Sequence, residues 1–235
     1  MELQRLLSSQ GFGSRAACRE LIRSGRIRVE GQVCRDPLAL VVPEGLVFSV
    51  DDITWSFRRF AYLALNKPAG YECSRRPLHH PSVYSLLPLP LRERGVQAVG
   101  RLDQDTTGLL LFTDDGAFIH DCTSPRKGVR KIYEVMSRHP VDDAQLAALL
   151  GGVVLHSEER PIAAASCQKT GEREMRLGVT LGKYHLVKRL VAAAGNRVEA
   201  LHRVAIGGLV LPDELLPGQW MWLDEGLRRR VFEQV

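Results

Sequence analysis

Short apolar runs separated by polar turns make up much of the chain. Leu109 to Phe112 form one such run, which begins after Gly108 and ends before the turn-forming Asp114-Asp115-Gly116. A run of this length with turn residues beside it predicts a buried strand, and we expect Gly100 and Gly108 to lie in loops. Comparable runs predict further strands at residues 62–65, 129–136, 152–155, 175–179, 198–204 and 209–211.

Helical spacing of apolar residues is confined to fewer segments. Residues 141–150 and 185–194 have this spacing, which predicts a helix in each. The predicted strands outnumber the predicted helices and do not alternate regularly with them. This order predicts an α+β fold with a mixed, largely antiparallel sheet, and it argues against a doubly wound α/β domain.

Near the N-terminus the pattern predicts a helix with two different faces. Ser14 is suited to cap its start, and Arg15, Arg19 and Arg23 follow at intervals of four residues. The other face is apolar and carries Ala17, Cys18, Leu21 and Ile22. We expect the apolar face to pack and the arginines to face outward.

The segment after this helix leads out of a small N-terminal domain. Gly25 is suited to end the helix, and residues 26–29 alternate basic and apolar side chains before Glu30-Gly31, as a half-buried strand entering a hairpin does. Residues 36–60 contain two prolines and several charged residues, and we expect them to hold the end of the small domain and a linker. The chain is therefore divided into a small domain with its linker at 1–55 and a larger domain at 56–235.

Charge is concentrated in the first domain. The whole chain has a net charge of +5 and an isoelectric point near 9.1, which favours a polyanionic partner. Residues 1 to 35 hold seven arginines against three glutamates. Guanidinium groups grip phosphates, so we expect RNA contacts at Arg15, Arg19, Arg23, Arg26 and Arg28. The alternative is a solvated helix face. Aromatic residues are scarce here, which favours recognition of phosphates and RNA shape over base stacking.

Other features of the composition narrow the class of protein. No apolar run approaches the roughly 20 residues that span a membrane, and the first residues lack the pattern of a signal peptide, so we expect a cytoplasmic protein. Its five cysteines are scattered, which argues against disulfides. The histidines are not spaced as metal ligands, and we expect no metal.

Asp103 is the residue with the most evident capacity for chemistry. It is preceded by a basic residue, Arg101, and followed by the apolar run at 109–112. A carboxylate presented from a loop against a core loses hydration, and a cation must compensate for that loss; Arg101 is one candidate. The alternative is a structural or helix-capping aspartate.

Three ordered motifs resemble the pseudouridine synthases of the RsuA type. Residues 100–116, GRLDQDTTGLLLFTDDG, resemble the active-site motif of that family, G-R-L-D followed by D-T-x-G-L-L and a T-x-D-G turn. Residues 131–135 resemble its K-x-Y-x-V strand, and residues 182–189 resemble its G-R-x-H-Q-V-K-R segment. Residues 1 to about 37 also resemble an S4 RNA-binding domain. The resemblance implies a pseudouridine synthase catalytic domain after an S4-like domain, without a cofactor or metal.

The resemblance assigns roles to four residues. Asp103 would be the catalytic carboxylate, and Tyr133 would stack on the target uracil and assist removal of its C5 proton. Lys188 would pair with Asp103, and Arg101 would help to extrude the base or hold the RNA backbone. The alternatives are a core tyrosine and a solvated helix lysine. Further RNA contacts are expected on the surface of the larger domain, at Lys127, Arg130, Lys183 and Arg203.

The substrate implied by the resemblance is ribosomal RNA or a ribosomal subunit assembly intermediate, bound by a monomer. The wording of residues 105–108, 123–125 and 182–185 favours 16S RNA, with 23S RNA as the alternative. Leu186 replaces the usual Gln and Met221 a common Arg, which affects substrate preference more than the reaction. A glycoside hydrolase using Asp103 and Asp105 is disfavoured by the arginine-rich module. A non-catalytic rRNA-binding or assembly protein is the other alternative.

Overall fold

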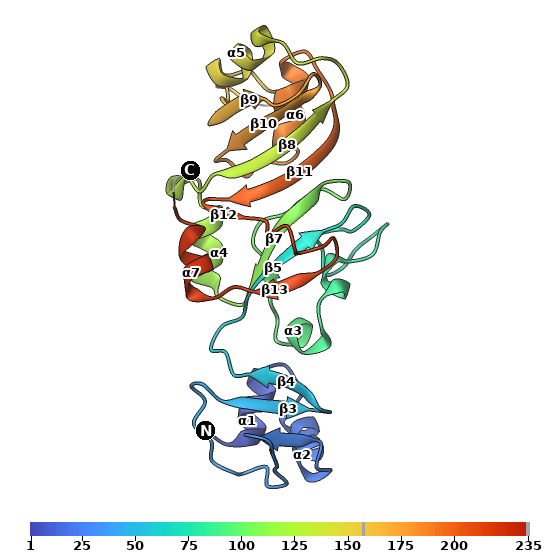
Figure 1. Ribbon diagram of the computed structural model, residues 1–235, viewed down its shortest axis with the longest axis vertical. Helices are drawn as coiled ribbons and strands as arrows, with labels where there is room; N and C mark the ends of the chain where they lie inside the picture. The colour runs from blue at the N-terminus through green and yellow to red at the C-terminus, as the bar shows by residue number, and fades with distance from the viewer. Residues whose placement is uncertain (157, 234–235) are drawn as a thin grey trace. The chain divides into compact units, whose positions relative to one another are not determined.

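The computed structural model describes residues 1–156 and 158–233. It divides into two compact units (Figure 1). The first unit comprises Met1–Ala61 with Leu87–Gln97, and the second comprises Tyr62–Leu86 with Ala98–Val235. The chain thus returns to the first unit once after leaving it. These units are groups of residues in contact, so a domain boundary after residue 55 stays a prediction.

The first unit packs helices against a small antiparallel sheet. The helices are α1 (Leu3–Ser9), α2 (Arg15–Arg23) and α3 (Leu89–Glu93), and the strands are β1 (Ile27–Val29), β2 (Gln32–Val33), β3 (Val47–Val50) and β4 (Ile53–Ser56). The strand order is β2-β1-β3-β4. Leu3, Leu6 and Leu7 of α1 form the core with Ile22 of α2 and Phe48 of β3.

Helix α2 has the two faces that the sequence predicts. The Ser14 side chain accepts a hydrogen bond from the Ala17 amide at 3.2 Å, which caps the helix start. Cys18 and Ile22 are buried, whereas the three arginines of the opposite face are exposed. The chain leaves the helix through Gly25, whose φ of +78° lies in the left-handed region that glycine adopts without strain.

Residues 36–60 hold the end of the small domain, as the sequence pattern predicts, and most of the segment is not a linker. They contain β3 and β4, which pair in a hairpin whose turn is Asp51-Asp52. Both aspartates have positive φ angles, 50° and 64°, as a two-residue turn between twisted strands requires. Phe48 and Val50 are buried, so this hairpin is part of the core of the first unit. The prolines and charges that suggested a linker lie in the loops around the two strands.

The second unit is built on one mixed sheet. Its strands are β5 (Tyr62–Lys67), β6 (Gln97–Ala98), β7 (Thr107–Thr113), β8 (Lys131–Ser137), β9 (Ser166–Lys169), β10 (Glu174–Val179), β11 (Val198–Ile206), β12 (Leu209–Val210) and β13 (Trp220–Trp222). The order along the sheet is β13-β5-β7-β11-β8-β10-β9 (Figure 1). The pairing of β7 with β11 is parallel and the other pairs along this path are antiparallel. The predicted α+β class and largely antiparallel sheet are confirmed.

One predicted strand is wrong. Residues 152–155 form a single bridge, between Val153 and Ile162, and no strand. Gly152 has a φ of +96° because it ends the preceding helix, so the apolar residues after it begin a loop.

Three of the four helices that the structure describes in the second unit begin at capping aspartates. The four helices are α4 (Gly116–Thr123), α5 (Asp143–Gly151), α6 (Leu186–Ala193) and α7 (Glu225–Arg230), with 3₁₀ turns at Val83–Leu86 and Pro125–Lys127. Asp115, Asp142 and Asp224 accept hydrogen bonds from the first turns of α4, α5 and α7. Asp114-Asp115-Gly116 therefore starts a helix as well as ending a strand. The helices predicted at 141–150 and 185–194 are confirmed.

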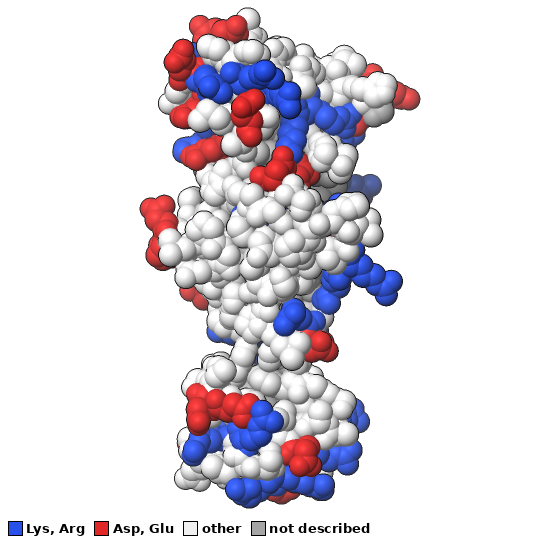
Figure 2. Space-filling view, turned by 90° about the vertical axis from the view of Figure 1, so that its right-hand side faces the viewer, with Lys and Arg blue, Asp and Glu red and all other residues white. Residues whose placement is uncertain are grey.

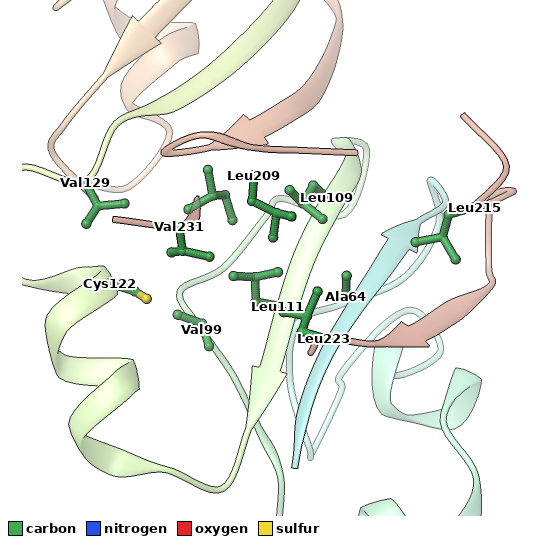
Figure 3. Packing of buried hydrophobic residues seen from close by; sticks show 11 residues of the cluster. Ala64, Val99, Leu109, Leu111, Cys122, Val129, Leu209, Leu215, Leu223 and Val231 are labelled. Carbon is green, nitrogen blue, oxygen red and sulfur yellow. The ribbon is translucent and has the colours of Figure 1, made fainter. Parts of the chain in front are cut away.

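Strand β7 lies at the centre of the second unit. Leu109 to Phe112 are completely buried, as predicted, and Leu109 and Leu111 pack with Ala64 of β5, Leu209 and Val231 (Figure 3). Gly108 lies inside β7 and not in a loop. A Cβ atom there would lie 2.3 Å from the Arg203 carbonyl oxygen, so glycine allows β7 and β11 to approach. β7 is thus fixed directly after the loop that carries Asp103.

Two further observations concern the whole chain. All five cysteines are free thiols. Within residues 1–156 and 158–233, no helix is both long enough and apolar enough to cross a membrane.

Candidate active site

A cavity of about 370 Å³ opens in the second unit beside the start of β7. Its walls come from the loop before β7, from β8 and β11, and from residues 181–188, which lead into α6. Asp103, Tyr133, Lys188 and Arg101 all line it. The fold therefore brings together four residues that lie up to 87 positions apart in the sequence (188 minus 101).

Asp103 lies in the loop between β6 and β7 and its side chain is 24% exposed. Two cationic or potentially cationic groups flank it. Lys188 Nζ is 3.2 Å from Oδ2, and His185 Nε2 is 3.3 Å from Oδ1. Lys188 pairs with Asp103, as the resemblance implies, whereas Arg101 is exposed and belongs to neither of these contacts. The charge of Asp103 is thus compensated by α6 and the residue before it, and not by its neighbour in sequence.

Lys188 also holds a second carboxylate. Its Nζ donates hydrogen bonds to both oxygens of Asp105, at 2.7 and 2.9 Å. Burial alone would raise the pKa of Asp105, but the hydrogen bonds and charge of Lys188 outweigh it and lower that pKa. Burial likewise opposes the charge on Lys188, yet its bonds to Asp105 and Asp103 raise its pKa. Lys188 is therefore a fixed cation between two carboxylates.

The loop that carries Asp103 is anchored by a buried lysine that sequence reasoning did not assign to the site. Lys67 is completely buried at the end of β5, and its Nζ donates to the carbonyl oxygens of Gln104, at 3.1 Å, and Thr106, at 2.8 Å. Burial lowers the pKa of Lys67. Lys67 lies just beyond the strand predicted at residues 62–65, and its position in the sequence alone does not indicate that it is buried.

Tyr133 lies on β8 against the inner end of the cavity and is 9% exposed. Arg203 of β11 contacts it: the guanidinium carbon is 5.9 Å from the ring centroid, and Nη1 donates to the tyrosine hydroxyl at 3.4 Å. Nε of Arg203 donates to the Leu109 carbonyl at 2.7 Å. These contacts fix the tyrosine ring from behind.

The local sequence pattern predicts Arg203 on the surface, and this prediction is wrong. Arg203 is 3% exposed and lines the cavity. Lys131, at the start of β8, lies in the same wall, where its Nζ donates to the carbonyl oxygens of Cys122 and Val129. Burial and the nearby charge of Arg203 lower the pKa of Lys131 to about 8. The inner wall of the cavity therefore has a positive character that the sequence did not reveal.

His185 is another residue that sequence reasoning missed as part of the site. It precedes α6 with a φ of 51°, in the left-handed region, and its imidazole reaches Asp103. A signal was present in residues 182–189, where the family motif places a His before the basic pair. Among the residues that the structure describes, no group of three or more His, Cys, Asp or Glu side chains is arranged to bind a metal ion.

The predicted RNA contacts of the first unit differ in their availability. Arg15, Arg19 and Arg23 are exposed on α2, and no ion pair engages them among the described residues. Arg26 instead pairs with Asp51, and Arg28 Nε lies 3.5 Å from Asp52. Figure 2 shows basic and acidic side chains side by side on one face of this unit. The free basic surface is thus smaller than the sequence suggests.

Comparison with known proteins assigns the chain to a family. Residues 61–192 match the family model described as RNA pseudouridylate synthase, and residues 1–44 match the S4 domain. The chain belongs to the RNA pseudouridylate synthase family. The predicted S4-like domain is confirmed, and this pseudouridine synthase carries Asp103, Tyr133 and Lys188 within the matched region.

Relatives of this pseudouridine synthase are similar along almost their whole length. A protein of Escherichia coli (strain K12) named ribosomal small subunit pseudouridine synthase A is 38% identical over 231 residues, covering 96% of this chain and 97% of its own. Proteins of the same name from Yersinia pestis and Haemophilus influenzae are 38% and 32% identical. A crystal structure of a pseudouridylate synthase superposes with a TM-score of 0.70 at 31% identity, covering 98% of this chain and 99% of that one.

Proposed function

We propose that this enzyme converts a uridine of 16S ribosomal RNA into pseudouridine, with Asp103 as the catalytic carboxylate. The observation that carries the proposal is the position of Asp103, between Lys188 and His185 in a cavity that Tyr133 also lines. The choice of RNA is supported by the relatives named ribosomal small subunit pseudouridine synthase A, which are similar over nearly the whole chain.

The reaction breaks one bond to the ribose and forms another. The C1′–N1 bond of the uridine breaks, the uracil turns, and its C5 bonds to the same C1′. The net proton transfer is from C5 to N1, so atoms and electrons balance without a cofactor. The freed uracil must stay bound while it turns, and a cavity of about 370 Å³ lies within the ~300–1,000 Å³ range of small-ligand sites.

The carboxylate of Asp103 would act next to the ribose, which becomes electron-poor as the glycosidic bond breaks. The carboxylate can attack the sugar or the base, remove a proton at C2′, or stabilise positive charge on the ribose. Lys188 holds the carboxylate in place from α6 at 3.2 Å. Each of these routes needs a carboxylate oxygen held against the bound nucleotide, at C1′, at the base or at the C2′ hydrogen.

Tyr133 is placed to hold the target base. Its ring lines the cavity and is held by Arg203, and an aromatic ring in that position is suited to stack on uracil. Near Asp103, it is also suited to assist removal of the C5 proton. Arg101, exposed at the same cavity, is suited to hold the RNA backbone.

Recognition of the RNA is assigned to both units. Arg15, Arg19 and Arg23 of α2 would bind phosphates, with Arg26 and Arg28 contributing less because they already pair with Asp51 and Asp52. Extruding a stacked uridine costs on the order of a few kcal/mol, which such contacts offset. The partner is 16S RNA or an assembly intermediate of the small subunit, and we expect the enzyme to act as a monomer in the cytoplasm, where ribosomes are assembled.

The first test is to map pseudouridine, by carbodiimide treatment and primer extension, in 16S and 23S RNA from cells with and without this gene. We expect one 16S site to vanish without the gene and to return with the wild-type protein. A missing site in 23S RNA would replace the proposed substrate, and no change in either RNA would favour a binding protein.

The variant that tests the role of Asp103 is Asp103→Asn, which keeps the shape of the side chain and removes its charge. We expect it to bind the RNA normally and to lose activity by more than about 10³-fold, as enzymes do when an essential group is removed. Activity equal to that of the wild-type protein would reject the role of Asp103.

A further inference from the structure

The segment from Gly182 to Arg189 forms one side of the cavity, and its charged side chains are already engaged. Lys183 and Arg189 both pair with Glu158, and Arg189 also donates to the His156 carbonyl. Lys188 and His185 bind Asp103. These contacts fix the backbone of the segment at several points. They also leave its cations with little free capacity for phosphate.

Tyr184 is the exception in this segment. It is 71% exposed although it lines the cavity that contains Asp103. One face of its ring stacks on the imidazole of His185, with a centroid separation of 3.7 Å and an interplanar angle of 20°. Because the residue is so exposed, much of the ring remains open to a ligand. The structure thus holds a flat aromatic surface rigidly at the rim of the site.

We propose that Tyr184 is a stacking platform for the base adjacent to the target uridine, an inference that rests on the proposed function. When a uridine is extruded from RNA, its neighbours lose a stacking partner. An exposed tyrosine ring replaces that partner, since any base has a face that stacks on an aromatic side chain. The ligand of this site is therefore an unpaired nucleobase, and its sequence preference is weak.

The position of Tyr184 links the platform to the catalytic carboxylate. His185 contacts the tyrosine ring on one side and Asp103 on the other, the latter at 3.3 Å. A base stacked on Tyr184 is consequently held at a fixed distance from Asp103. This role differs from that of Tyr133, which is 9% exposed and lies inside the cavity, where the uracil itself would bind.

The experiment compares Tyr184→Phe, which keeps the aromatic ring, with Tyr184→Leu, which keeps an apolar side chain without a stacking face. The probe is 16S RNA isolated from cells that lack this gene, and the dissociation constant is measured by filter binding at several salt concentrations. Val154→Ala is the matched control, because Val154 is an exposed apolar residue of the same unit that does not line the cavity. Melting temperatures verify that each variant is folded.

We expect Tyr184→Phe and Val154→Ala to bind like the wild-type protein and Tyr184→Leu to bind about tenfold more weakly, as expected when one stacked base is lost. The slope of log Kd against log salt should stay unchanged, because no charge is removed. Equal affinities of the Phe and Leu variants would overturn the platform, and so would a change of slope. Failure of the wild-type protein to convert any uridine would instead reject the proposed function, while the affinities would still decide about Tyr184.

Discussion

Lys188 serves two carboxylates at once, and this arrangement separates their roles. Asp105 receives both hydrogen bonds and is exposed enough to meet solvent, whereas Asp103 lies 3.2 Å from the same Nζ and faces the cavity. A lysine shared in this way cannot swing out toward solvent without losing contacts with both partners. Asp105 thus acts as a positioning residue, which holds the cation that in turn holds Asp103.

Replacement of Lys188 by Met should therefore impair catalysis more than RNA binding. We expect the single-turnover rate to fall about 10²-fold, the scale for removing one preorganised charged group from an active site. Lys188→Arg should recover part of the rate because it retains the charge. Rates at saturating enzyme and dissociation constants for 16S RNA would be measured in parallel.

The control for this prediction is Lys169→Met, which removes an exposed lysine of β9 that does not line the cavity. It should leave the rate unchanged. The pairing role of Lys188 would be contradicted if Lys188→Met lowered affinity and left the rate at saturation intact.

Among the elements, the parallel pairing of β7 with β11 sets the geometry of the site. Gly108 faces Arg203 in this register. The same strands carry the loop with Asp103 and the arginine that supports Tyr133, so their separation fixes both groups. Gly108 has a φ of +102° and its Cβ position lies 2.3 Å from the Arg203 carbonyl oxygen, which leaves no room for a side chain.

Gly108→Ala should accordingly destabilise the second unit strongly. A left-handed conformation costs an alanine about 1–2 kcal/mol, and the backbone clash adds about 1–3 kcal/mol. Gly195→Ala is the control, because Gly195 has a φ of +84° with open space around its Cβ position. Gly195→Ala should lose only the free energy that the left-handed conformation costs, without the cost of a clash. Urea unfolding of both variants would measure the difference, and equal losses would show that the clash with Arg203 is relieved by a small shift.

For the molecule as a whole, tertiary pairing separates two sets of arginines in the first unit, those of α2 and the pair Arg26 and Arg28. Arg26, directly before β1, and Arg28 of β1 are engaged by the two aspartates of the β3–β4 turn, while the arginines of α2 have no such partner among the described residues. In the sequence, nothing distinguishes the arginines of α2 from Arg26 and Arg28. Tertiary pairing therefore decides which of them can release counterions from RNA.

Changing Arg15, Arg19 and Arg23 to Ala should weaken binding to 16S RNA and flatten its salt dependence. With each phosphate contact contributing about 0.7–0.9 to the slope, the triple variant should lose about 2 to 3 units of slope. The double variant Arg26→Ala, Arg28→Ala should change the slope less. Binding titrations between low and moderate salt would give both slopes, and an unchanged slope in the triple variant would exclude α2 as the phosphate-binding face.

The class of fold, the family and most of the elements around the site can be predicted from the sequence. The buried run at 109–112, the capped helix α2 and the motif residues Asp103, Tyr133 and Lys188 are local patterns, and local patterns report burial and chain direction. Local patterns also led to two expectations that differ from the structure. The prolines near β3 and β4 suggested a linker, and the apolar residues after Gly152 suggested a strand. In both places the conformation depends on what the segment packs against.

Which side chains contact one another depends on long-range packing that the sequence pattern does not reveal. Lys67 against the loop that carries Asp103, Arg203 against Tyr133, and His185 against Asp103 are contacts between segments far apart in the chain. Neither periodicity nor composition reports such contacts. From the sequence alone, a lysine or arginine that donates to buried carbonyl oxygens cannot be distinguished from one that is exposed to solvent. The parallel pairing of β7 with β11 brings Arg203 beside the strand that follows Asp103, and it is a long-range contact that Gly108 permits by having no side chain.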